Sequence, residues 1–364
     1  MSLVPRRVIK NMQAVTHGGF DHAELAALGL KPGDVIDFSV STNPFMPPPG
    51  LRELLAEAPI DRYPDSRSTE LTDKLAERLG ISPGHILAGS GTTELIRAVA
   101  ITYFRHRDTV LVLEPTYGEY EPAVRLAGAR IIKYRAGEEN NFVPDINAVT
   151  ELIAKHRPRA VFVCNPNNPT GYLYSREAIE RMVDASGDTL LILDEAYMTF
   201  IEAGWSSLAL TERANVISLR SMTKDYGLPG LRLGYAVARA EIIESLRLSL
   251  PPWNVNAPAQ AAGLAVLDRD DYLKQSLQQI QEARDYLTKE IAGMGFTVMP
   301  SDASYFLVKV GNATECRRSL LKHGIMVRDC TSFGLPGYIR VSPRSLPDCR
   351  KLTAALSILL EPEA

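Results

Sequence analysis

The chain has 364 residues, of which 45% are hydrophobic and 23% charged, the balance of an ordinary globular protein with a full core. Its formal net charge is -3 with both signs interspersed, which excludes the basic stripe that binds nucleic acid. No apolar run approaches the length that spans a membrane, and residues 1–13 lack the apolar segment of a secretory signal. We therefore expect a cytoplasmic protein with neither a nucleic-acid nor a membrane partner.

The four cysteines stand far apart in the chain and form no C-x-x-C pair: Cys164, Cys316, Cys330 and Cys349. This spacing argues against a zinc site or a disulfide framework. We expect no metal site.

Short apolar runs alternate with helical patterns between about residues 70 and 240. The runs predict strands over 109–115, 129–134, 159–166, 189–197 and 215–221, and the patterns predict helices over 71–80, 92–105, 146–157 and 176–186. The strands are continuously apolar rather than alternating, as expected for strands covered on both faces. This predicts an α/β domain with a mainly parallel sheet.

The pattern changes after the proline-rich segment 250–258. A long helical region over 257–291 precedes strands over 296–300, 304–310, 325–330 and 338–343, with helices over 315–324 and 347–360. This predicts a smaller α+β domain. At 364 residues two domains are expected. We expect an N-terminal arm over 1–45 that contributes to the small domain, a large domain over 46–255 and a small domain over 256–364.

Polar clusters follow several of the predicted strands, where ligands gather in an open α/β sheet. In the first cluster, two glycines precede Thr92 and Thr93, which begin a helix whose free N–H groups can bind an anion. A plain helix cap is the competing interpretation. A dinucleotide fingerprint is less favoured, because the third glycine of G-x-G-x-x-G is missing.

Two further clusters follow the strands over 159–166 and 189–197. In the segment 164–171, proline and glycine indicate a turn, but a plain turn does not explain its three asparagines. Asp194 and Glu195 follow four apolar residues, and a poorly solvated carboxylate requires a positive partner. A salt bridge or a helix cap would satisfy Asp194 equally well.

Lys224 lies in the fourth cluster, after Ser221 and Thr223 and eight residues before Arg232. An isolated lysine there would be a solvated loop residue. Hydroxyls and a guanidinium suit a phosphate, and a desolvated lysine near other cations becomes a usable nucleophile. A phosphate site, an acid for a ring nitrogen and an amine for an aldehyde together predict pyridoxal 5'-phosphate (PLP).

The segments "NPNNPTG", "DEAY" and "SMTKDYGLPGLRLGY", in this order and spacing, resemble the fold-type I PLP enzymes of the class I/II aminotransferase family. The resemblance runs from about Asp37 to Ser345. It implies the aspartate aminotransferase-like fold and a homodimer whose active sites lie at the subunit interface.

The resemblance also implies roles for individual residues. Lys224 would be the catalytic Schiff-base lysine, Asp194 the partner of the pyridine nitrogen and Tyr117 the residue stacked on the ring. Asn168 and Tyr197 would bond the ring hydroxyl. The phosphate would be held by Gly91, Thr92, Ser221, Thr223, Arg232 and Tyr63 of the partner subunit. The substrate-binding residues would be His17, Asn43, Arg328 and Arg340, of which Arg340 would bind an α-carboxylate.

Two branches of the family are similar to this chain, and both handle phosphorylated substrates. "NPNNPTG", "DEAY" and "NVNAPAQAA" resemble histidinol-phosphate aminotransferases. "HGG" at His17, Trp253, and the C-terminal segment with Arg328, Arg340 and Arg344 resemble threonine-phosphate decarboxylases of cobalamin synthesis. We expect decarboxylation of L-threonine O-3-phosphate to an aminopropanol phosphate, with transamination of histidinol phosphate by 2-oxoglutarate as the alternative.

Two observations bear on this expectation. The segment "STNPFMPPP", where Ser41 and Thr42 precede Asn43, departs from the decarboxylase pattern. An inactive PLP-binding regulatory protein is a further alternative, disfavoured because Lys224 and Asp194 occur together with Arg232 and because the resemblance leaves no room for a DNA-binding domain.

Overall fold

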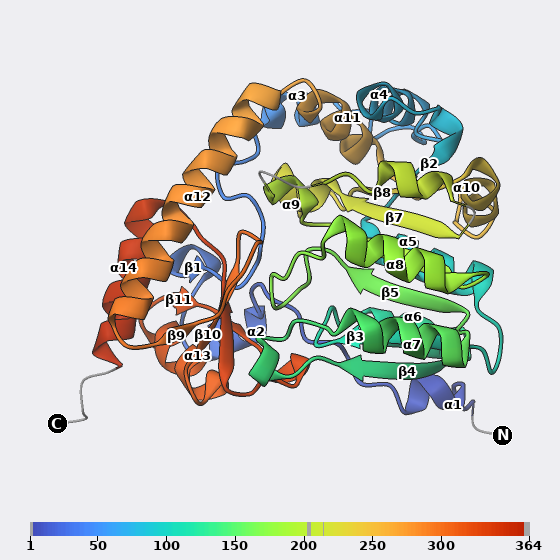
Figure 1. Ribbon diagram of the computed structural model, residues 1–364. Helices are drawn as coiled ribbons and strands as arrows, with labels where there is room; N and C mark the ends of the chain where they lie inside the picture. The colour runs from blue at the N-terminus through green and yellow to red at the C-terminus, as the bar shows by residue number, and fades with distance from the viewer. Residues whose placement is uncertain (1–2, 202–204, 214, 360–364) are drawn as a thin grey trace.

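A seven-stranded sheet forms the centre of the structure, a computed structural model that describes residues 3–201, 205–213 and 215–359 (Figure 1). Its strand order is β2-β8-β7-β6-β5-β3-β4, and β8 alone runs antiparallel to its neighbours. The strands are β2 (Ile86–Gly89), β3 (Thr109–Glu114), β4 (Arg130–Arg135), β5 (Ala160–Cys164), β6 (Leu190–Asp194), β7 (Val216–Ser221) and β8 (Gly234–Val237). The mainly parallel sheet expected from the sequence is confirmed.

Helices cover both faces of this sheet. Phe162 of β5 packs with residues of α5 (Thr92–Tyr103), α6 (Tyr120–Leu126) and α10 (Ala240–Arg247). Its neighbours Val161 and Val163 pack on the opposite face with α7 (Ile146–His156) and α8 (Arg176–Ser186). Successive strand residues point to opposite faces, so strands covered twice must be apolar throughout.

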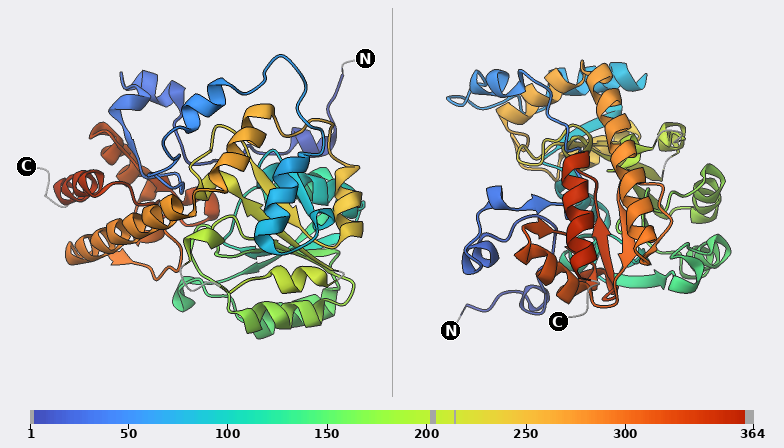
Figure 2. Two further views of the ribbon diagram at one scale, coloured as in Figure 1. Left: turned by 90° about the horizontal axis from the view of Figure 1, so that it is seen from above. Right: turned by 90° about the vertical axis from the view of Figure 1, so that its left-hand side faces the viewer.

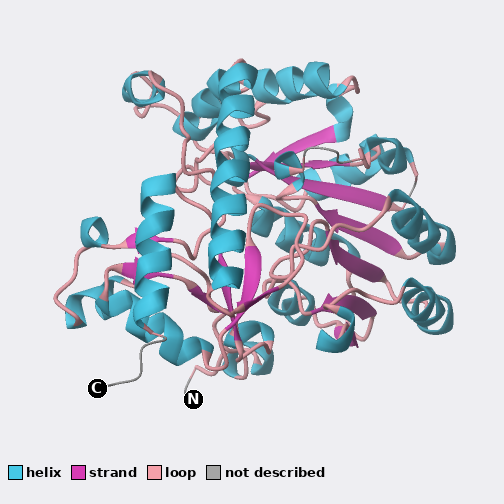
Figure 3. Cartoon of the chain, turned by 60° about the vertical axis from the view of Figure 1, so that its left-hand side comes forward, coloured by secondary structure: helices cyan, strands magenta, loops and turns pink. Residues whose placement is uncertain are grey.

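The C-terminal lobe is a four-stranded antiparallel sheet of order β12-β13-β10-β9. Its strands are β9 (Thr297–Val298), β10 (Phe306–Lys309), β12 (Arg328–Asp329) and β13 (Tyr338–Val341). α12 (Asp270–Gly293), α13 (Ala313–Lys322) and α14 (Leu346–Ile358) share its core. Figures 2 and 3 show α12 and α14 side by side. This is the smaller α+β lobe expected from the sequence.

The predicted helix over 257–291 is two helices. α11 (Ala257–Val266) ends before Arg269, whose φ of -115° and ψ of 41° are not helical, and α12 follows. α11 packs against α3 (Leu51–Ala56) and α4 (Thr69–Leu79) in the core beneath β2 and β8. We therefore propose that the large domain extends through α11, beyond the boundary expected at 255.

The predicted strand over 325–330 is also divided. β11 (Ile325–Met326) pairs with β1 (Ile36–Asp37) in a separate parallel sheet, whereas β12 belongs to the four-stranded sheet. Val327 between them is fully buried. The chain therefore changes sheet without leaving the core, which an apolar pattern cannot reveal.

The N-terminal arm contacts both lobes. α1 (Arg7–Lys10) lies against α6 of the large lobe, and α2 (His22–Ala27) buries Leu25 against Leu321 and Met326 of the small lobe. In Figure 1 the arm passes from one lobe to the other on the side of β3 and β4. Within the described part of the chain, no helix is both long enough and apolar enough to cross a membrane.

Candidate active site

The carboxyl ends of β2, β3, β5, β6 and β7 lie at one edge of the sheet, because these strands run in the same direction. β8 begins at this edge with Gly234, which pairs with both Gly89 and Ser221. The four polar clusters found in the sequence therefore converge. This is the edge at which open α/β sheets bind ligands.

Lys224 lies in α9 (Met222–Asp225), a single helical turn after β7. The Ser221 hydroxyl caps this turn by accepting a hydrogen bond from the Thr223 amide at 3.1 Å. Desolvation, with the positive charges of Arg340 and Arg232, lowers the pKa of Lys224 to about 8, although Asp194 opposes the shift. Lys224 is therefore not an ordinary solvated lysine, and its neutral, nucleophilic form is unusually accessible.

Asp194 ends β6 and is only 3% exposed. It accepts hydrogen bonds from the Tyr120 hydroxyl at 2.8 Å and from the Ala196 amide at 3.2 Å. Burial outweighs these bonds and raises the pKa of Asp194 to about 6. A buried carboxylate in this state is stabilised by a cationic partner such as a protonated ring nitrogen.

Tyr120 is a site residue that the sequence did not indicate. Its ring stacks on Phe162 with centroids 4.6 Å apart, which places its hydroxyl against Asp194. The pattern shows Tyr120 only as one apolar position of α6, so no sequence signal distinguishes it.

Gly91 and Gly234 leave room for a phosphate at the start of α5. Gly91 has φ +79° and ψ 164°, and a Cβ there would lie 2.8 Å from Nη2 of Arg232. A Cβ on Gly234 would lie 2.9 Å from the Arg220 carbonyl oxygen of β7 and 3.1 Å from the Thr92 amide nitrogen. Glycine is thus required where the Arg232 guanidinium and the amides of a helix N-terminus meet, as an anion site requires.

The hydroxyls near this cradle differ in what they can still donate. Ser221 uses its oxygen as an acceptor, which leaves its proton for a ligand. Thr223 donates its proton to the Leu233 carbonyl at 3.1 Å. A role for Thr223 in binding phosphate, as the resemblance implies, would require that hydroxyl to rotate.

The three asparagines after β5 have different roles. Asn165 accepts from the Tyr174 amide at 2.9 Å, and Asn167 bonds Thr116, Thr170 and the Pro115 carbonyl, so both stabilise the loop. Asn168 instead accepts a hydrogen bond from Arg340 of the small lobe. Of the three side-chain amides, that of Asn168 joins the two lobes at the site.

Two tyrosines proposed to contact the cofactor ring lie near Lys224 and Asp194. Tyr117 packs edge-on against Tyr120, and its hydroxyl lies 3.2 Å from that of Thr93. Tyr197 is 6% exposed, and its ring centroid lies 6.0 Å from Nζ of Lys224. Burial raises the pKa of both phenols, that of Tyr117 to about 12, so both hydroxyls keep their protons and can donate them.

Arg328 and Arg340 face one another on adjacent strands of the small lobe. They are register partners of β12 and β13, and they are 5% and 4% exposed. Arg340 donates to the Ser39 carbonyl and to Asn168, and its buried Nε has no partner in the part of the chain that the structure describes. Desolvation and the charge of Arg340 lower the pKa of Arg328 to about 10. Among the described residues, no carboxylate pairs with either guanidinium.

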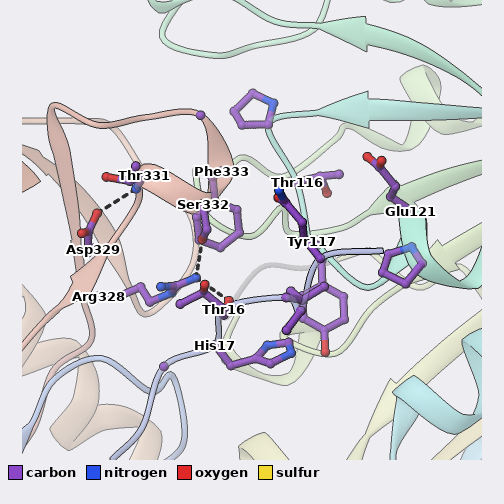
Figure 4. A pocket seen from close by; sticks show the side chains of 18 of the residues that line it. Thr16, His17, Thr116, Tyr117, Glu121, Arg328, Asp329, Thr331, Ser332 and Phe333 are labelled. Carbon is purple, nitrogen blue, oxygen red and sulfur yellow. Dashed lines mark hydrogen bonds between the residues drawn. The ribbon is translucent and has the colours of Figure 1, made fainter. Parts of the chain in front are cut away.

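His17 lies beside Tyr117 on the wall of a cavity of about 1550 Å3 (Figure 4). The two rings are 6.1 Å apart, and Nε2 of His17 bonds Glu119 at 2.9 Å. Arg328 lines the same cavity and donates to the Thr16 carbonyl and the Ser332 hydroxyl, as the dashed lines show. The structure thus brings His17 and Arg328 together from opposite ends of the chain.

Asn43 and Tyr63 do not line this cavity, and neither do Lys224, Asp194 and Arg340. The Asn43 amide donates to the Asp225 carbonyl and to Ser276, and its backbone N–H donates to the Lys224 carbonyl. It has no hydrogen left for a substrate, so the role predicted for it in substrate binding gains no support. Tyr63 is 76% exposed and stacks on Trp253 at 4.3 Å.

Arg344 also has a contact outside the cavity. Its guanidinium donates to the Asp37 carbonyl and lies at the junction of β1 with the small lobe. This contact between the arm and the small lobe gives Arg344 a structural position.

The donor set fits PLP: a buried amine with a lowered pKa, a buried carboxylate with a raised pKa, and a glycine-lined cradle beside an arginine. The family model for aminotransferase class I and II matches residues 33–357. The chain belongs to the class I/II aminotransferase family, and its cofactor is PLP.

Three known proteins illustrate the similarity. A histidinol-phosphate aminotransferase of Moorella thermoacetica is 38% identical over 86% of this chain and 82% of its own length. The structure of L-threonine-O-3-phosphate decarboxylase from Porphyromonas gingivalis is 26% identical, with a TM-score of 0.78 over 89% of this chain and 99% of that one. Histidinol-phosphate aminotransferase from Sinorhizobium meliloti, solved with PLP, is 23% identical with a TM-score of 0.86 over 97% and 96% of the chains, which shows the fold.

Proposed function

We propose that this PLP-dependent enzyme acts on a phosphorylated primary amine. The observation that carries this proposal is the pair Arg328 and Arg340, two buried guanidinium groups on adjacent strands without a carboxylate partner in the described structure. Burying two like charges costs free energy unless an anion accompanies them. A phosphate dianion supplies two negative charges and accepts the forked hydrogen bonds that arginine donates.

We infer that the reaction is the transamination of histidinol phosphate. The amino group would pass to 2-oxoglutarate, which would leave as glutamate. This choice is supported by the histidinol-phosphate aminotransferase of Moorella thermoacetica and by relatives of the same name from Thermoanaerobacter and Symbiobacterium, 33–38% identical. Glutamate carries no phosphate but has two carboxylates, so the same arginine pair can serve both half-reactions in turn.

The residues of this chain would divide the work as follows. Bound PLP supplies an aldehyde that captures the substrate amine and a ring that withdraws electrons from the carbon beside it. Lys224, with its lowered pKa, would remove the proton from that carbon and would donate it to a different one, the former aldehyde carbon of the cofactor. Asp194 would hold the ring nitrogen, and Gly91, Ser221 and Arg232 would hold the cofactor phosphate.

Decarboxylation of threonine phosphate, expected from the sequence, remains the second candidate. The observation that favours it is the position of His17, of "HGG", on the cavity wall beside Tyr117 and near Arg328. Threonine phosphate carries a carboxylate and a phosphate together, so it would engage Arg340 and Arg328 at once. Departure of CO2 then depends on Arg340 holding the carboxylate perpendicular to the cofactor ring.

A product assay distinguishes the two reactions. The purified, PLP-loaded enzyme is offered histidinol phosphate with 2-oxoglutarate and, separately, threonine phosphate alone. Glutamate from the first mixture without CO2 from the second supports the aminotransferase. CO2 and an aminopropanol phosphate from the second would replace this assignment by the decarboxylase. If the enzyme turns over neither histidinol phosphate nor threonine phosphate, the proposal that its substrate is one of these phosphorylated amines is wrong.

We also propose that the chain acts as a homodimer. Tyr63 and Trp253 form a stacked aromatic pair that is 76% and 43% exposed. Large aromatic side chains exposed together are typical of protein interfaces. A position at the subunit interface would allow Tyr63 to reach the cofactor phosphate in the partner subunit.

A further inference from the structure

Glu119 is a buried carboxylate that follows Tyr117 and Gly118, two residues that line the cavity of His17, but does not line that cavity itself. It lies two residues after Tyr117, directly before α6, and is 8% exposed. One oxygen accepts a hydrogen bond from Nε2 of His17 at 2.9 Å, and the other lies 3.4 Å from Nη2 of Arg97. A buried carboxylate is stable only with such partners. The two contacts therefore explain how Glu119 is accommodated, but they are not equivalent.

The contact with His17 is the stronger of the two. Its length is that of a good hydrogen bond, whereas 3.4 Å is a weak contact, and the two side chains are similarly exposed, 48% for His17 and 52% for Arg97. It also joins residues 102 positions apart, so it fixes the N-terminal arm to the large lobe. Glu119 therefore acts chiefly on His17 and on the arm.

The bond to Glu119 decides which atom of His17 faces a ligand. A carboxylate can only accept a hydrogen bond, so Nε2 must carry the proton that is shared with Glu119. Nδ1 is the ring nitrogen left for the cavity, where the His17 side chain remains 48% exposed. The ring is held beside Tyr117 at 6.1 Å, with an interplanar angle of 48°.

The arm has a second anchor that a substrate would remove. Nη2 of Arg328 donates to the Thr16 carbonyl at 2.7 Å, directly before His17. An anionic group that binds Arg328 competes with this carbonyl for the same donor. Once Arg328 turns to a substrate, the bond to Glu119 becomes the main polar contact that keeps His17 beside Tyr117, together with the bond from Gly19 to Ser39.

We propose that Glu119 is a positioning residue, which holds His17 over the cavity so that Nδ1, a hydrogen-bond donor when the ring is doubly protonated, meets the phosphorylated substrate. This inference rests on the proposed function. It assigns no direct contact between Glu119 and the substrate or PLP. Glu119 is expected to govern substrate affinity and to leave cofactor binding unchanged.

The test compares Glu119→Gln, His17→Ala and the double variant, all loaded with PLP, on whichever phosphorylated substrate the wild-type enzyme turns over. Glu119→Gln should raise KM about 5- to 10-fold, equivalent to about 1 kcal/mol, with kcat within about twofold. The Kd of PLP should stay unchanged. The double variant should be no worse than His17→Ala, because Glu119 acts through His17.

Arg97→Met is the matched control, because it removes the other partner of Glu119 and is expected to leave KM unchanged. Additive effects in the double variant, or an equal rise of KM in Arg97→Met, would overturn the proposal. So would a loss of kcat without a change of KM.

A second measurement separates this inference from the proposed function. Hydrogen–deuterium exchange of residues 15–19 in the PLP-loaded protein needs no substrate, and Glu119→Gln should accelerate it. If the wild-type enzyme turns over neither substrate, the proposed function fails. Faster exchange would then still support Glu119 as the anchor of the arm, whereas unchanged exchange would refute that role.

Discussion

At the residue scale, Asp194 links stability to cofactor binding. Burial raises its pKa from 3.8 to about 6, so the folded apoprotein holds the carboxyl proton more tightly than the unfolded chain does. The contribution of this proton to the free energy of unfolding is fully present below pH 3.8 and is lost as the pH rises through 6. At pH 7.5 the buried charge then costs up to about 3 kcal/mol when no cationic ring is bound.

Asp194→Asn should therefore stabilise the apoprotein at pH 7.5, by about 1–3 kcal/mol, and weaken PLP binding. Urea unfolding of the PLP-free proteins between pH 4 and 8 measures this, and the gain should shrink toward pH 4. Asp188→Asn, at an exposed position just before β6, is the control. A less stable Asp194→Asn apoprotein at pH 7.5 would show that the carboxylate is already compensated by the protein.

Lys224 gives a second prediction at this scale. Reduction of the PLP-loaded enzyme with borohydride should link the cofactor irreversibly to the chain, and Lys224→Ala should abolish this linkage because it removes the amine. The measurement is the intact mass after reduction and denaturation. Retention of covalent cofactor in Lys224→Ala would place the attachment at another lysine.

The sequence could identify the chemistry of these residues but not their partners. It showed an amide-rich loop after β5, yet only the structure shows that Asn165 and Asn167 bond the loop while Asn168 meets Arg340. The sequence predicted that Asn43 binds the substrate, whereas in the structure the Asn43 side-chain amide donates to the Asp225 carbonyl and to the Ser276 hydroxyl. The contacts of Asn168 and Asn43 join segments more than 100 residues apart, and no local pattern records them.

At the element scale, the turn from β2 into α5 depends on Gly91. Gly91→Ala would place a Cβ 2.8 Å from the Arg232 guanidinium, at a φ of +79° that disfavours other residues. Such strain costs about 1–3 kcal/mol. The Kd of PLP, followed by the absorbance of the bound cofactor, should rise about tenfold or more.

Gly230→Ala is the control for this prediction, because a Cβ there meets no atom of the described residues within 4 Å and its φ is not positive. An unchanged Kd in Gly91→Ala would show that the cradle does not contact the cofactor phosphate.

Elements were predictable where a single environment extends over the whole segment. β5 and β6 are buried on both faces, so their continuous apolar runs were sufficient. The pattern failed where the environment changes without a change of residue type. Val327 is buried between two sheets, and the helix break at Arg269 contains neither proline nor glycine.

At the scale of the whole molecule, the proposed dimer predicts complementation between two defective chains. Tyr63→Ala impairs the site of the partner subunit, and Lys224→Ala impairs its own site. Unfolding and refolding an equal mixture should create hybrid dimers with one intact site, restoring up to about a quarter of wild-type activity. Each variant refolded alone is the control. No recovery in a mixture shown by sedimentation to be dimeric would place Tyr63 within its own subunit.

The separation of Arg328 and Arg340 from Lys224 and Asp194 has an evolutionary consequence. The residues that would hold PLP lie on the large lobe, whereas the two arginines lie on neighbouring strands of the small lobe and His17 lies on the arm. Mutations that alter the arm or the small sheet can therefore change which amine is accepted while the catalytic apparatus is inherited intact. A transaminase and a decarboxylase can thus diverge from one ancestor through changes in these peripheral segments, without passing through an ancestor that has lost its cofactor.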